Sequence, residues 1–434
     1  MASDMAKTEL AVLICGQLAG MLWQDEARLF GFSYEPRYSG APLSISMPVS
    51  NRSYGQDVVR PYLFGLLPDS ERQRRALAKE NGVSANNPVA LLSCMGLDCP
   101  GAVQFCSPET LDGALNRKGT YRILNDKDIA ARLKSIRTDF DATWAGRDES
   151  WSLGGNQGKF ALAWENESWC ECGGSSPTTH IFKNGVVGFK FEALNEFVCM
   201  RTAAKVGIPT AQVDYRLFGD EPALIVSRYD RILTPSGVQR AHQEDLCQAL
   251  GVMPEQKYTS DGGPTARDVL ELLLATGKSS ANLRLFTQML FFNCLIGAPD
   301  AHAKNYSLLL SASGDALIAP MYDVASGLAY DRTRDLGKLA MSIGGENRVG
   351  RIGASAICRY VGQNAPELKE RLEENGLSAD VCIAEMGRLA KAVPTAMSEV
   401  LDDAERADLP GVAELGTRLL PNVKKNCAAT SRLL

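Results

Sequence analysis

An aspartate and an asparagine with four residues between them, Asp300 and Asn305, lie in a segment that reads Gly-Ala-Pro-Asp-Ala-His-Ala-Lys-Asn-Tyr-Ser. A protein kinase catalytic loop has this spacing, because its Asp accepts the proton of the attacking hydroxyl and its Asn holds a magnesium ion. Asp323 follows 18 residues after Asn305 (323 − 305), and a pair of strands between them would return it to the same metal. Oxygen ligands of this kind suit Mg²⁺ and substrate phosphates. The pattern predicts phosphoryl transfer, with Asp300 as the catalytic residue and Asn305 and Asp323 as metal ligands.

A glycine-rich turn, Ser152–Lys159, is the second feature suited to phosphate. Gly154, Gly155 and a third glycine allow backbone amides to approach phosphate oxygens, and Lys159 adds a positive charge. The turn is not a Walker A loop, because Leu153 stands where that motif needs its first glycine. Two interpretations are open, a plain hairpin turn or a nucleotide contact. The position of the turn at the start of a β-rich lobe favours the nucleotide contact.

Lys183 ends a strand that otherwise reads His-Ile-Phe. A lysine in this place can contact ATP phosphates, as the strand lysine of kinases does, or can be a surface residue at a strand end. Glu196 follows 13 residues later (196 − 183) on a predicted helix and is a possible partner carboxylate. For Glu196 we favour a solvated helix face.

Two histidines and an aspartate have several possible roles. His302 lies between Asp300 and Asn305 and is a catalytic base by residue type, but we favour a structural or substrate-positioning role because Asp300 already supplies the base. His242 precedes Gln-Glu-Asp and can order the start of a helix. Asp245 either contacts the active site or caps that helix.

Composition limits the class of protein. The 434 residues predict two or three domains, and a net charge of −5 makes sequence-independent DNA binding by this chain alone a poor hypothesis. The 12 cysteines are scattered without a Cys-x-x-Cys pair and only three histidines occur, which argues against a zinc site and fits a reducing cytoplasm. The apolar stretch Leu10–Trp23 is too short to span a bilayer and is broken by glycines, so we expect a β-hairpin and no membrane association.

The order of the expected elements predicts an α+β fold with a bilobal, protein-kinase-like core and an additional small N-terminal α+β domain. We expect the N-terminal domain at residues 1–110, a connecting segment at 111–148, a β-rich kinase N-lobe at 149–235 and a helical C-lobe at 236–434. The expected strands are Leu10–Ile14, Gly20–Trp23, Leu29–Tyr34, Leu43–Met47, Phe160–Trp164, His180–Lys183, Ala223–Val226, Ser307–Leu310 and Ala316–Ile318. The expected helices include Asp69–Glu80, one that starts near Asn87, one around Asp126–Ile136 and Glu192–Val206.

Over nearly its whole length the chain resembles HipA-type serine/threonine kinases, the toxin half of bacterial toxin–antitoxin pairs. The motifs that carry the resemblance are Leu63–Pro68, Gly96–Ala102, Pro177–Lys183, Asn195-Glu196, Gln243–Gln248, Lys257-Tyr258, Asp261–Pro264, Gly297–Ser307, Tyr322-Asp323 and Lys338–Met341. A single motif would be weak, whereas this ordered set is specific.

The resemblance implies a role for each matching residue. Asp300 matches the catalytic aspartate, and Asn305 and Asp323 match the magnesium ligands. The residues implied to bind ATP are Lys183, Gly154, Gly155, Gln157, Lys159, Ser227, Tyr229, Asp230 and His302, with the segment from Ser227 to Tyr229 as the hinge that holds adenine. Ser152 matches the serine that such kinases autophosphorylate, a modification that displaces the glycine-rich turn and switches the kinase off.

Two departures from the family pattern concern ATP binding. The family turn reads Ser-x-Ala-Gly-Ala-Gln-x-Lys, whereas here it reads Ser-Leu-Gly-Gly-Asn-Gln-Gly-Lys. Extra glycines cost ordering entropy, so we expect this turn to close less readily. Ser227 stands where a glutamate is common, and adenine binding should survive because hinge contacts use the backbone.

The resemblance implies an ATP- and Mg²⁺-dependent toxin that phosphorylates a translation component, such as an aminoacyl-tRNA synthetase. It also implies a HipB-like helix-turn-helix antitoxin and operator DNA bound through that partner. Two alternatives remain: a catalytically silent corepressor bound to the antitoxin, and a kinase for a small molecule. The presence of Asp300, Asn305, Asp323 and Lys183 disfavours the first, and the N-terminal motifs disfavour the second.

Overall fold

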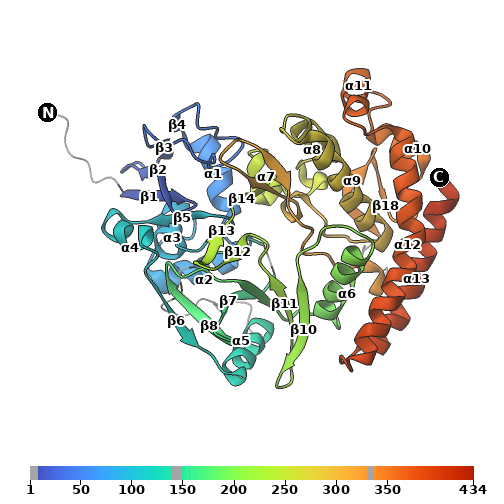
Figure 1. Ribbon diagram of the computed structural model, residues 1–434, viewed down its shortest axis with the longest axis horizontal. Helices are drawn as coiled ribbons and strands as arrows, with labels where there is room; N and C mark the ends of the chain where they lie inside the picture. The colour runs from blue at the N-terminus through green and yellow to red at the C-terminus, as the bar shows by residue number, and fades with distance from the viewer. Residues whose placement is uncertain (1–7, 139–148, 150, 156, 331–336) are drawn as a thin grey trace.

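The structure of this chain is a computed structural model that describes residues 8–138, 149, 151–155, 157–330 and 337–434. Figure 1 shows sheets in the first half of the chain, coloured blue to green, and a group of long helices at the opposite side, coloured orange to red. This mixture of antiparallel sheets and packed helices confirms the predicted α+β fold class. Part of the predicted connecting segment, residues 139–148, and Asn156 of the glycine-rich turn lie outside the described residues.

The first sheet is the base of what we call the N-terminal domain. Its antiparallel order is β4-β3-β2-β1-β5, with bounds Thr8–Ile14 for β1, Gln17–Gln24 for β2, Phe30–Tyr34 for β3, Ser53–Tyr54 for β4 and Val103–Cys106 for β5. The predicted first hairpin is confirmed, and it turns at Cys15 and Gly16, which both have positive φ. Three helices share one apolar core with this sheet, α1 (Gln56–Gly65), α2 (Glu71–Asn81) and α3 (Pro88–Met95).

The predicted strand Leu43–Met47 is wrong. Only one bridge joins Ser44 to Met47, because the segment wraps around the side chain of Tyr34. The Tyr34 hydroxyl accepts a hydrogen bond from the Leu43 N–H and donates one to the Met47 carbonyl, both at 2.6 Å. Helix α1 is not predicted by the sequence, because Pro61 lies inside it and proline ordinarily ends a helix.

The second sheet forms the N-lobe, with the antiparallel order β10-β11-β9-β7-β8-β6. Its strands are β6 (Gly119–Ile123), β7 (Lys159–Glu165), β8 (Ser168–Gly174), β9 (His180–Lys183), β10 (Val213–Phe218) and β11 (Glu221–Ser227). The three strands predicted in this lobe are confirmed. Strand β6 and helix α5 (Asp126–Thr138) come from the predicted connecting segment, yet β6 pairs with β8 along its length and α5 packs on the sheet.

Helix α6 (Glu192–Lys205) joins the two lobes. It packs on β10 and β11 of the N-lobe and on α12 of the C-lobe, and most of its residues are buried. The helix stops before Gly207, whose φ of +88° ends it where the sequence predicts. The polar residues on its buried faces must therefore find partners inside the protein.

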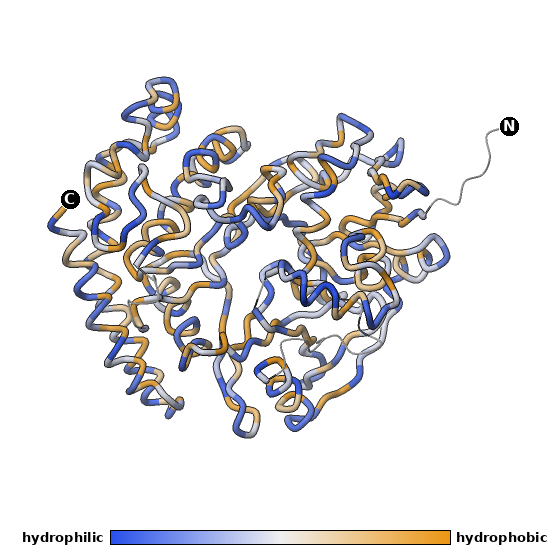
Figure 2. The backbone as a smooth tube through the Cα atoms, turned by 180° about the vertical axis from the view of Figure 1, so that it is seen from behind, coloured by the Kyte–Doolittle hydropathy of each residue, from blue (hydrophilic) through white to orange (hydrophobic). Residues whose placement is uncertain are grey.

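The C-lobe is built from helices α8 (Ala266–Leu274), α9 (Ser279–Ile296), α10 (Ala354–Tyr360), α11 (Pro366–Glu374), α12 (Ala379–Arg406) and α13 (Val412–Leu433). Figure 2 shows hydrophilic and hydrophobic stretches alternating along the two long C-terminal helices. Buried residues of α12 recur every three or four positions, as in a helix that buries one stripe. Among the residues that the structure describes, no helix is long and apolar enough to cross a membrane.

A small sheet in the C-lobe holds the segment Gly297–Ser307, which the sequence predicts to be catalytic and which we call the catalytic segment. Its order is β14-β15-β16, with bounds Gln243–Asp245, Ser307–Leu310 and Ala316–Ile318, and the latter two strands are confirmed predictions. Helix α9 ends at Gly297, which has a φ of +62° and lies so close to Leu328 that a Cβ would be 2.7 Å from that side chain. The chain then crosses to β15, so the catalytic segment is fixed at one end by a helix and at the other by a strand. Two hairpins, β12–β13 (Arg231–Thr234, Gly237–Arg240) and β17–β18 (Lys338–Ile343, Glu346–Arg348), complete the strands.

Candidate active site

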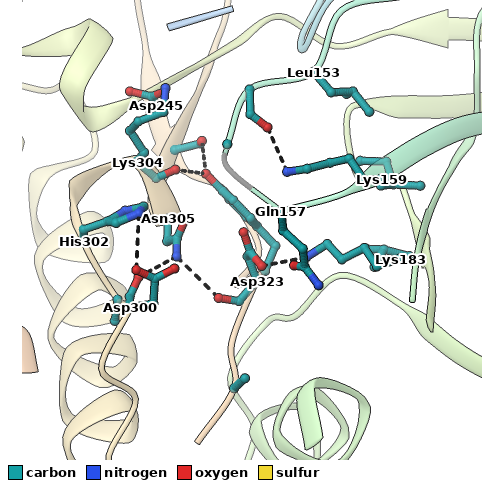
Figure 3. A pocket seen from close by; sticks show the side chains of 18 of the residues that line it. Leu153, Gln157, Lys159, Lys183, Asp245, Asp300, His302, Lys304, Asn305 and Asp323 are labelled. Carbon is teal, nitrogen blue, oxygen red and sulfur yellow. Dashed lines mark hydrogen bonds and ion pairs between the residues drawn. The ribbon is translucent and has the colours of Figure 1, made fainter. Parts of the chain in front are cut away.

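A cavity of about 600 Å³ lies where the N-lobe, the C-lobe and the N-terminal domain meet. The glycine-rich turn, β9, the segment after β11 and the catalytic segment contribute its walls, and Gly65 and Pro100 of the N-terminal domain complete it. Figure 3 shows that the lysines of the N-lobe and the carboxylates of the C-lobe face one another across this space. With the exception of Ser152, every residue predicted for catalysis, metal binding or ATP binding lines the cavity.

Asn305 braces the two predicted aspartates through their backbone. Its Nδ2 donates hydrogen bonds to the carbonyl oxygens of Asp300 at 2.7 Å and Asp323 at 3.5 Å (Figure 3). Asp323 has a φ of +57°, a left-handed conformation that aspartate tolerates better than most residues. The side chain of Asp300 is 66% exposed, so its carboxylate is open to an incoming hydroxyl.

The remaining oxygens suit a magnesium ion. Among the described residues, neither the Asn305 Oδ1 nor the second carboxylate oxygen of Asp323 has a hydrogen-bond partner. Burial acts to raise the pKa of Asp323, but the charges of Lys183 and Lys159 outweigh it and hold that pKa below its ordinary value. An ionised carboxylate and an amide oxygen fit Mg²⁺, which keeps several waters and takes few protein ligands.

Lys183, at the end of β9, pairs with two carboxylates. Its Nζ lies 2.7 Å from Glu196 Oε1 and 2.6 Å from Asp323 Oδ1. Glu196 is 1% exposed, so the solvated-face interpretation of this residue is wrong, and the cause is the burial of α6 on both sides. A strand lysine paired with a helix carboxylate is also the arrangement that active protein kinases have.

The glycine-rich turn lies against the N-terminal domain. Ser152 is 2% exposed, and its hydroxyl donates a hydrogen bond to the Leu66 carbonyl at 2.6 Å. A Cβ at Gly154 would lie 2.8 Å from the carbonyl oxygen of Gly65, so the backbones touch. Lys159 is buried beneath the turn and donates to the Gly154 carbonyl at 2.8 Å, and burial lowers its pKa.

Gln157 connects the far side of the turn to α6. Its Nε2 donates to Glu192 Oε2 at 3.3 Å. Burial and the neighbouring carboxylate of Glu196 raise the pKa of Glu192 to about 8. The turn is therefore in contact with the N-terminal domain on one side and with the first turn of α6 on the other.

The predicted hinge follows β11. The N–H groups of Ser227 and Arg228 donate to carbonyl oxygens of neighbouring segments at 2.9 Å each, so the fold uses both. The Tyr229 N–H has no acceptor among the described residues. The ring of Tyr229 lies 5.6 Å from that of Tyr322, and both side chains line the cavity. Of the hinge amides, that of Tyr229 is the donor left for a ligand.

Asp230 belongs to a buried charge cluster between the hinge and the N-terminal domain. Both of its oxygens accept hydrogen bonds, from the guanidinium groups of Arg228 and Arg231 and from the Gly101 N–H. Asp98 of the N-terminal domain binds the same two arginines from the other side. Both oxygens of the Asp230 carboxylate are therefore occupied by contacts within the protein.

Tyr258 and His302 flank Asp300. The Tyr258 hydroxyl donates a hydrogen bond to Asp300 Oδ1, and His302 Nε2 lies 3.7 Å from the same oxygen. The edge of one ring meets the face of the other at a centroid distance of 4.9 Å. Burial lowers the pKa of His302, so the neutral imidazole is favoured, which agrees with a structural or positioning role.

An ion network lies behind the catalytic segment. Lys304 Nζ lies 2.9 Å from Asp245 Oδ2 and 3.6 Å from Asp69 Oδ1. Asp245 also caps α7 (Leu246–Ala249) by accepting from the Gln248 N–H at 2.9 Å, so it combines the two roles that the sequence leaves open. His242 contacts the N-terminal domain, since its Nε2 lies 3.1 Å from the Leu43 carbonyl.

The sequence gives no role to Tyr258, Lys257 or Lys304, and it indicates only a helix cap for Asp69. The sequence feature that could have identified these residues is their charge. Lys257 and Lys304 stand in two segments that must line one cavity, and a lysine removed from water needs a carboxylate partner. Asp69 resembles a helix cap in the sequence, but Ser70 takes the cap by accepting from the Gln73 N–H, which leaves the Asp69 carboxylate for the lysines.

Comparisons with known proteins identify relatives of this chain. The HipA-like C-terminal domain matches residues 151–397, and the HipA N-terminal domain matches residues 10–106. A putative kinase, Y4mE of Sinorhizobium fredii, is 35% identical over 350 residues, which cover 76% of this chain and 79% of the relative. The serine/threonine-protein kinase toxin HipA of Shewanella oneidensis is 29% identical over 408 residues, which cover 89% of this chain and 88% of the relative. A solved complex of Shewanella oneidensis MR-1 HipA with HipB and operator DNA aligns with a TM-score of 0.77 and 26% identity over 98% of this chain and 100% of that chain. The chain therefore belongs to the HipA family of protein kinases.

Proposed function

We propose that this chain transfers the γ-phosphoryl group of ATP to a serine or threonine hydroxyl of a protein, with Mg²⁺ as the metal. One observation carries the proposal: Asp300, Asn305, Asp323 and Lys183 line a single cavity, and Glu196 forms an ion pair with Lys183. Each of these residues has the chemistry that phosphoryl transfer requires. A silent corepressor would have no need of the complete set.

The roles follow from the positions of the side chains. Asp300 orients the acceptor hydroxyl and accepts its proton, because its carboxylate is the exposed one. Lys183 contacts the phosphates, while Gly154 and Gly155 present backbone to them. Asn305 and Asp323 would hold Mg²⁺, which when bound neutralises charge on the phosphate oxygens. At the hinge, the Tyr229 N–H is the proposed donor to adenine.

We further propose that the kinase is the toxin of a toxin–antitoxin module. The relationship to the HipA toxin and to its complex with HipB and operator DNA supports a HipB-like helix-turn-helix antitoxin as partner. The net charge of −5 fits a route to operator DNA through that partner rather than through this chain alone. The proposed acceptor is a translation component of the aminoacyl-tRNA synthetase kind.

Ser152 is the proposed site of autophosphorylation. Its hydroxyl is buried against the Leu66 carbonyl, so the turn must leave this position before the serine can reach Asp300. A phosphate would add a charge near −2 to a serine packed against a carbonyl oxygen, and the turn would not return. The modification would therefore hold the ATP site open and inactive.

The experiment is intact-mass analysis with peptide mapping after incubation with Mg²⁺-ATP, for the wild type, Asp300→Asn and the exposed control Asp220→Asn. We expect a phosphate on Ser152 in the wild type and the control but not in Asp300→Asn, which should still bind ATP. Phosphate gain in Asp300→Asn would overturn the catalytic assignment. ATP binding by the wild type without transfer to itself or to any protein of a cell extract would favour the corepressor.

A growth assay tests the toxin role. Expression of the wild type should arrest growth, and co-expression of the antitoxin should restore it. Asp300→Asn should permit growth at the same protein level. Equal arrest by both proteins would separate toxicity from phosphoryl transfer.

A further inference from the structure

We infer that Asp69 of the N-terminal domain positions the glycine-rich turn for phosphate binding, so that the first domain is part of the nucleotide site. The inference rests on the proposed function in one respect, that the ligand of the cavity is a nucleoside triphosphate. It adds a positioning residue from outside the two kinase lobes. Neither the catalytic motif nor the hinge contains this residue.

Asp69 holds Gly155 by two reciprocal hydrogen bonds. The Asp69 N–H donates to the Gly155 carbonyl at 3.1 Å, and the Gly155 N–H donates to Asp69 Oδ1 at 3.4 Å. Pro68 forms a parallel bridge with Gly155, so the turn runs beside residues 68–69 like a short added strand. Gly155 has a φ of +95°, which only glycine adopts readily, and this conformation turns both of its polar groups toward Asp69.

The same carboxylate is tied to the catalytic side of the cavity. Asp69 Oδ2 lies 2.9 Å from Lys257 Nζ, and Oδ1 lies 3.6 Å from Lys304 Nζ. Lys304 is the residue immediately before Asn305, the proposed magnesium ligand. Asp69 therefore connects the N-terminal domain, the phosphate-binding turn and the catalytic segment through one side chain.

The Asp69 carboxylate and its two lysine partners are largely removed from water. The side chain of Asp69 is 9% exposed, and its two lysine partners are 11% and 5% exposed. Burial acts to raise the pKa of Asp69, but Lys304 and Lys257 lower it to about 2, so the residue is charged at neutral pH. A charged, buried side chain between three segments fixes their relative positions more firmly than an exposed pair would.

Helix capping does not account for Asp69. Ser70 is the N-cap of α2 and accepts from the Gln73 N–H, while the Asp69 side chain points to Gly155 and the lysines. The control for a charge change in this domain is Asp57, an exposed residue in the first turn of α1. Asp57→Asn removes a carboxylate from the same domain without touching the cavity.

The test compares a ligand with phosphates to one without. Isothermal titration of Mg²⁺-ATP and of adenosine is carried out on the wild type, Asp69→Asn and Asp57→Asn. We expect Asp69→Asn to weaken ATP binding about tenfold, which is about 1.4 kcal/mol, and to leave adenosine binding within twofold of the wild type. Asp57→Asn should match the wild type with both ligands. Unchanged ATP binding, or equal weakening of ATP and adenosine, would overturn the inference.

A second variant distinguishes the positioning role of Asp69 from a folding defect caused by an unpaired lysine. Asp69→Asn leaves Lys257 without its carboxylate, and Asp69→Asn/Lys257→Gln restores the balance of charge. The double variant should also show a tenfold loss in the ratio of ATP to adenosine affinity, and an unchanged ratio would overturn the inference. Both readouts are binding constants and do not depend on phosphoryl transfer. A wild type that binds ATP but transfers no phosphate would refute the proposed activity, while the titrations would still test the role of Asp69.

Discussion

The hydroxyl of Tyr258 donates a hydrogen bond to Oδ1 of Asp300, the proposed catalytic base. Asp300 is largely exposed, so this contact orients a carboxylate that could otherwise rotate in the open cavity. The rings of His302 and Tyr258 meet edge to face, so His302 supports the tyrosine ring. The second carboxylate oxygen stays available for the acceptor hydroxyl. We therefore regard Tyr258 as a positioning residue for the base.

Tyr258→Phe should lower kcat about tenfold and leave the dissociation constant for Mg²⁺-ATP unchanged. A hydrogen bond to a charged group contributes about 1.5–3 kcal/mol, and about 1.4 kcal/mol corresponds to tenfold in rate. Steady-state kinetics at saturating acceptor measures kcat, and titration measures the ATP affinity. Tyr121→Phe, at an exposed position of β6, is the control and should behave as the wild type. An unaltered kcat would remove Tyr258 from the mechanism.

Gly154→Ala should weaken Mg²⁺-ATP binding at least tenfold. The added methyl would lie 2.8 Å from the Gly65 carbonyl, which is backbone and cannot rotate away, so the glycine-rich turn must shift from its place. Titration with ATP measures the effect. Gly113→Ala is the matched control, because a Cβ there meets nothing within 4 Å. If both variants bind ATP like the wild type, the close contact between turn and domain is not needed for nucleotide binding.

The extra glycine at position 154 thus has a second explanation. The sequence suggests only that extra glycines make the turn harder to order. In the structure, Gly154 lies where the turn approaches the N-terminal domain too closely for a side chain. Gly155, which the family pattern shares, has a φ of +95°, a conformation that favours glycine.

Local signals predicted the catalytic segment, and long-range packing decided the rest. Asp300 and Asn305 lie on one short segment, so their spacing alone indicates their relation. Periodicity along α6 favours a solvated face for Glu196, because it cannot show that Lys183 at the end of β9 meets this residue. The role of Asp69 is equally hard to predict from the sequence. Its neighbours in sequence suggest a helix cap, whereas its partner Gly155 lies 86 residues away (155 − 69).

Asp98→Asn should destabilise the protein by about 3–5 kcal/mol, the cost of breaking a buried ion pair. Asp98 is 2% exposed and lies between 2.8 and 3.3 Å from the guanidinium groups of Arg228, Arg231 and Arg240. The amide cannot neutralise them, so Arg228 and Arg231 would share Asp230, and Arg240 would lose its carboxylate partner. Urea unfolding measures the loss, with the exposed Asp220→Asn as the control.

The same cluster gives the wild type a pH dependence at the acid side. Burial acts to raise the pKa of Asp98, but the three arginines outweigh it and hold it below its ordinary value of 3.8. A carboxyl with a lowered folded-state pKa stabilises the fold above the unfolded-state value, and this stability is lost as the pH falls through the folded-state value. The wild type should therefore lose its advantage over Asp98→Asn below about pH 4. A constant difference down to pH 2 would contradict this assignment.

Glu244 on β14 has the opposite electrostatic situation. It is fully buried, its Oε1 accepts a hydrogen bond from the Ile45 N–H at 2.8 Å, and its Oε2 has no partner among the described residues. Burial raises its pKa from 4.5 to about 8, although the Ile45 N–H and the Ser44 hydroxyl lower it in part. The folded protein thus favours the neutral acid, whereas the unfolded chain ionises above about pH 4.5.

Glu244→Gln should stabilise the protein at alkaline pH and have little effect near pH 5. The unfolded wild type binds fewer protons than the folded state between pH 4.5 and about 8, so wild-type stability falls as the pH rises through this range. Glutamine keeps an oxygen for the Ile45 N–H and cannot ionise, so the variant should exceed the wild type by roughly 2–4 kcal/mol at pH 8.5. Urea unfolding at pH 5, 6.5 and 8.5 gives the three differences, and Glu370→Gln, an exposed residue of α11, is the control. A difference that does not grow with pH would mean that Glu244 is already ionised in the folded protein, and that the contact between the N-terminal domain and β14 contains a charge instead of a neutral acid.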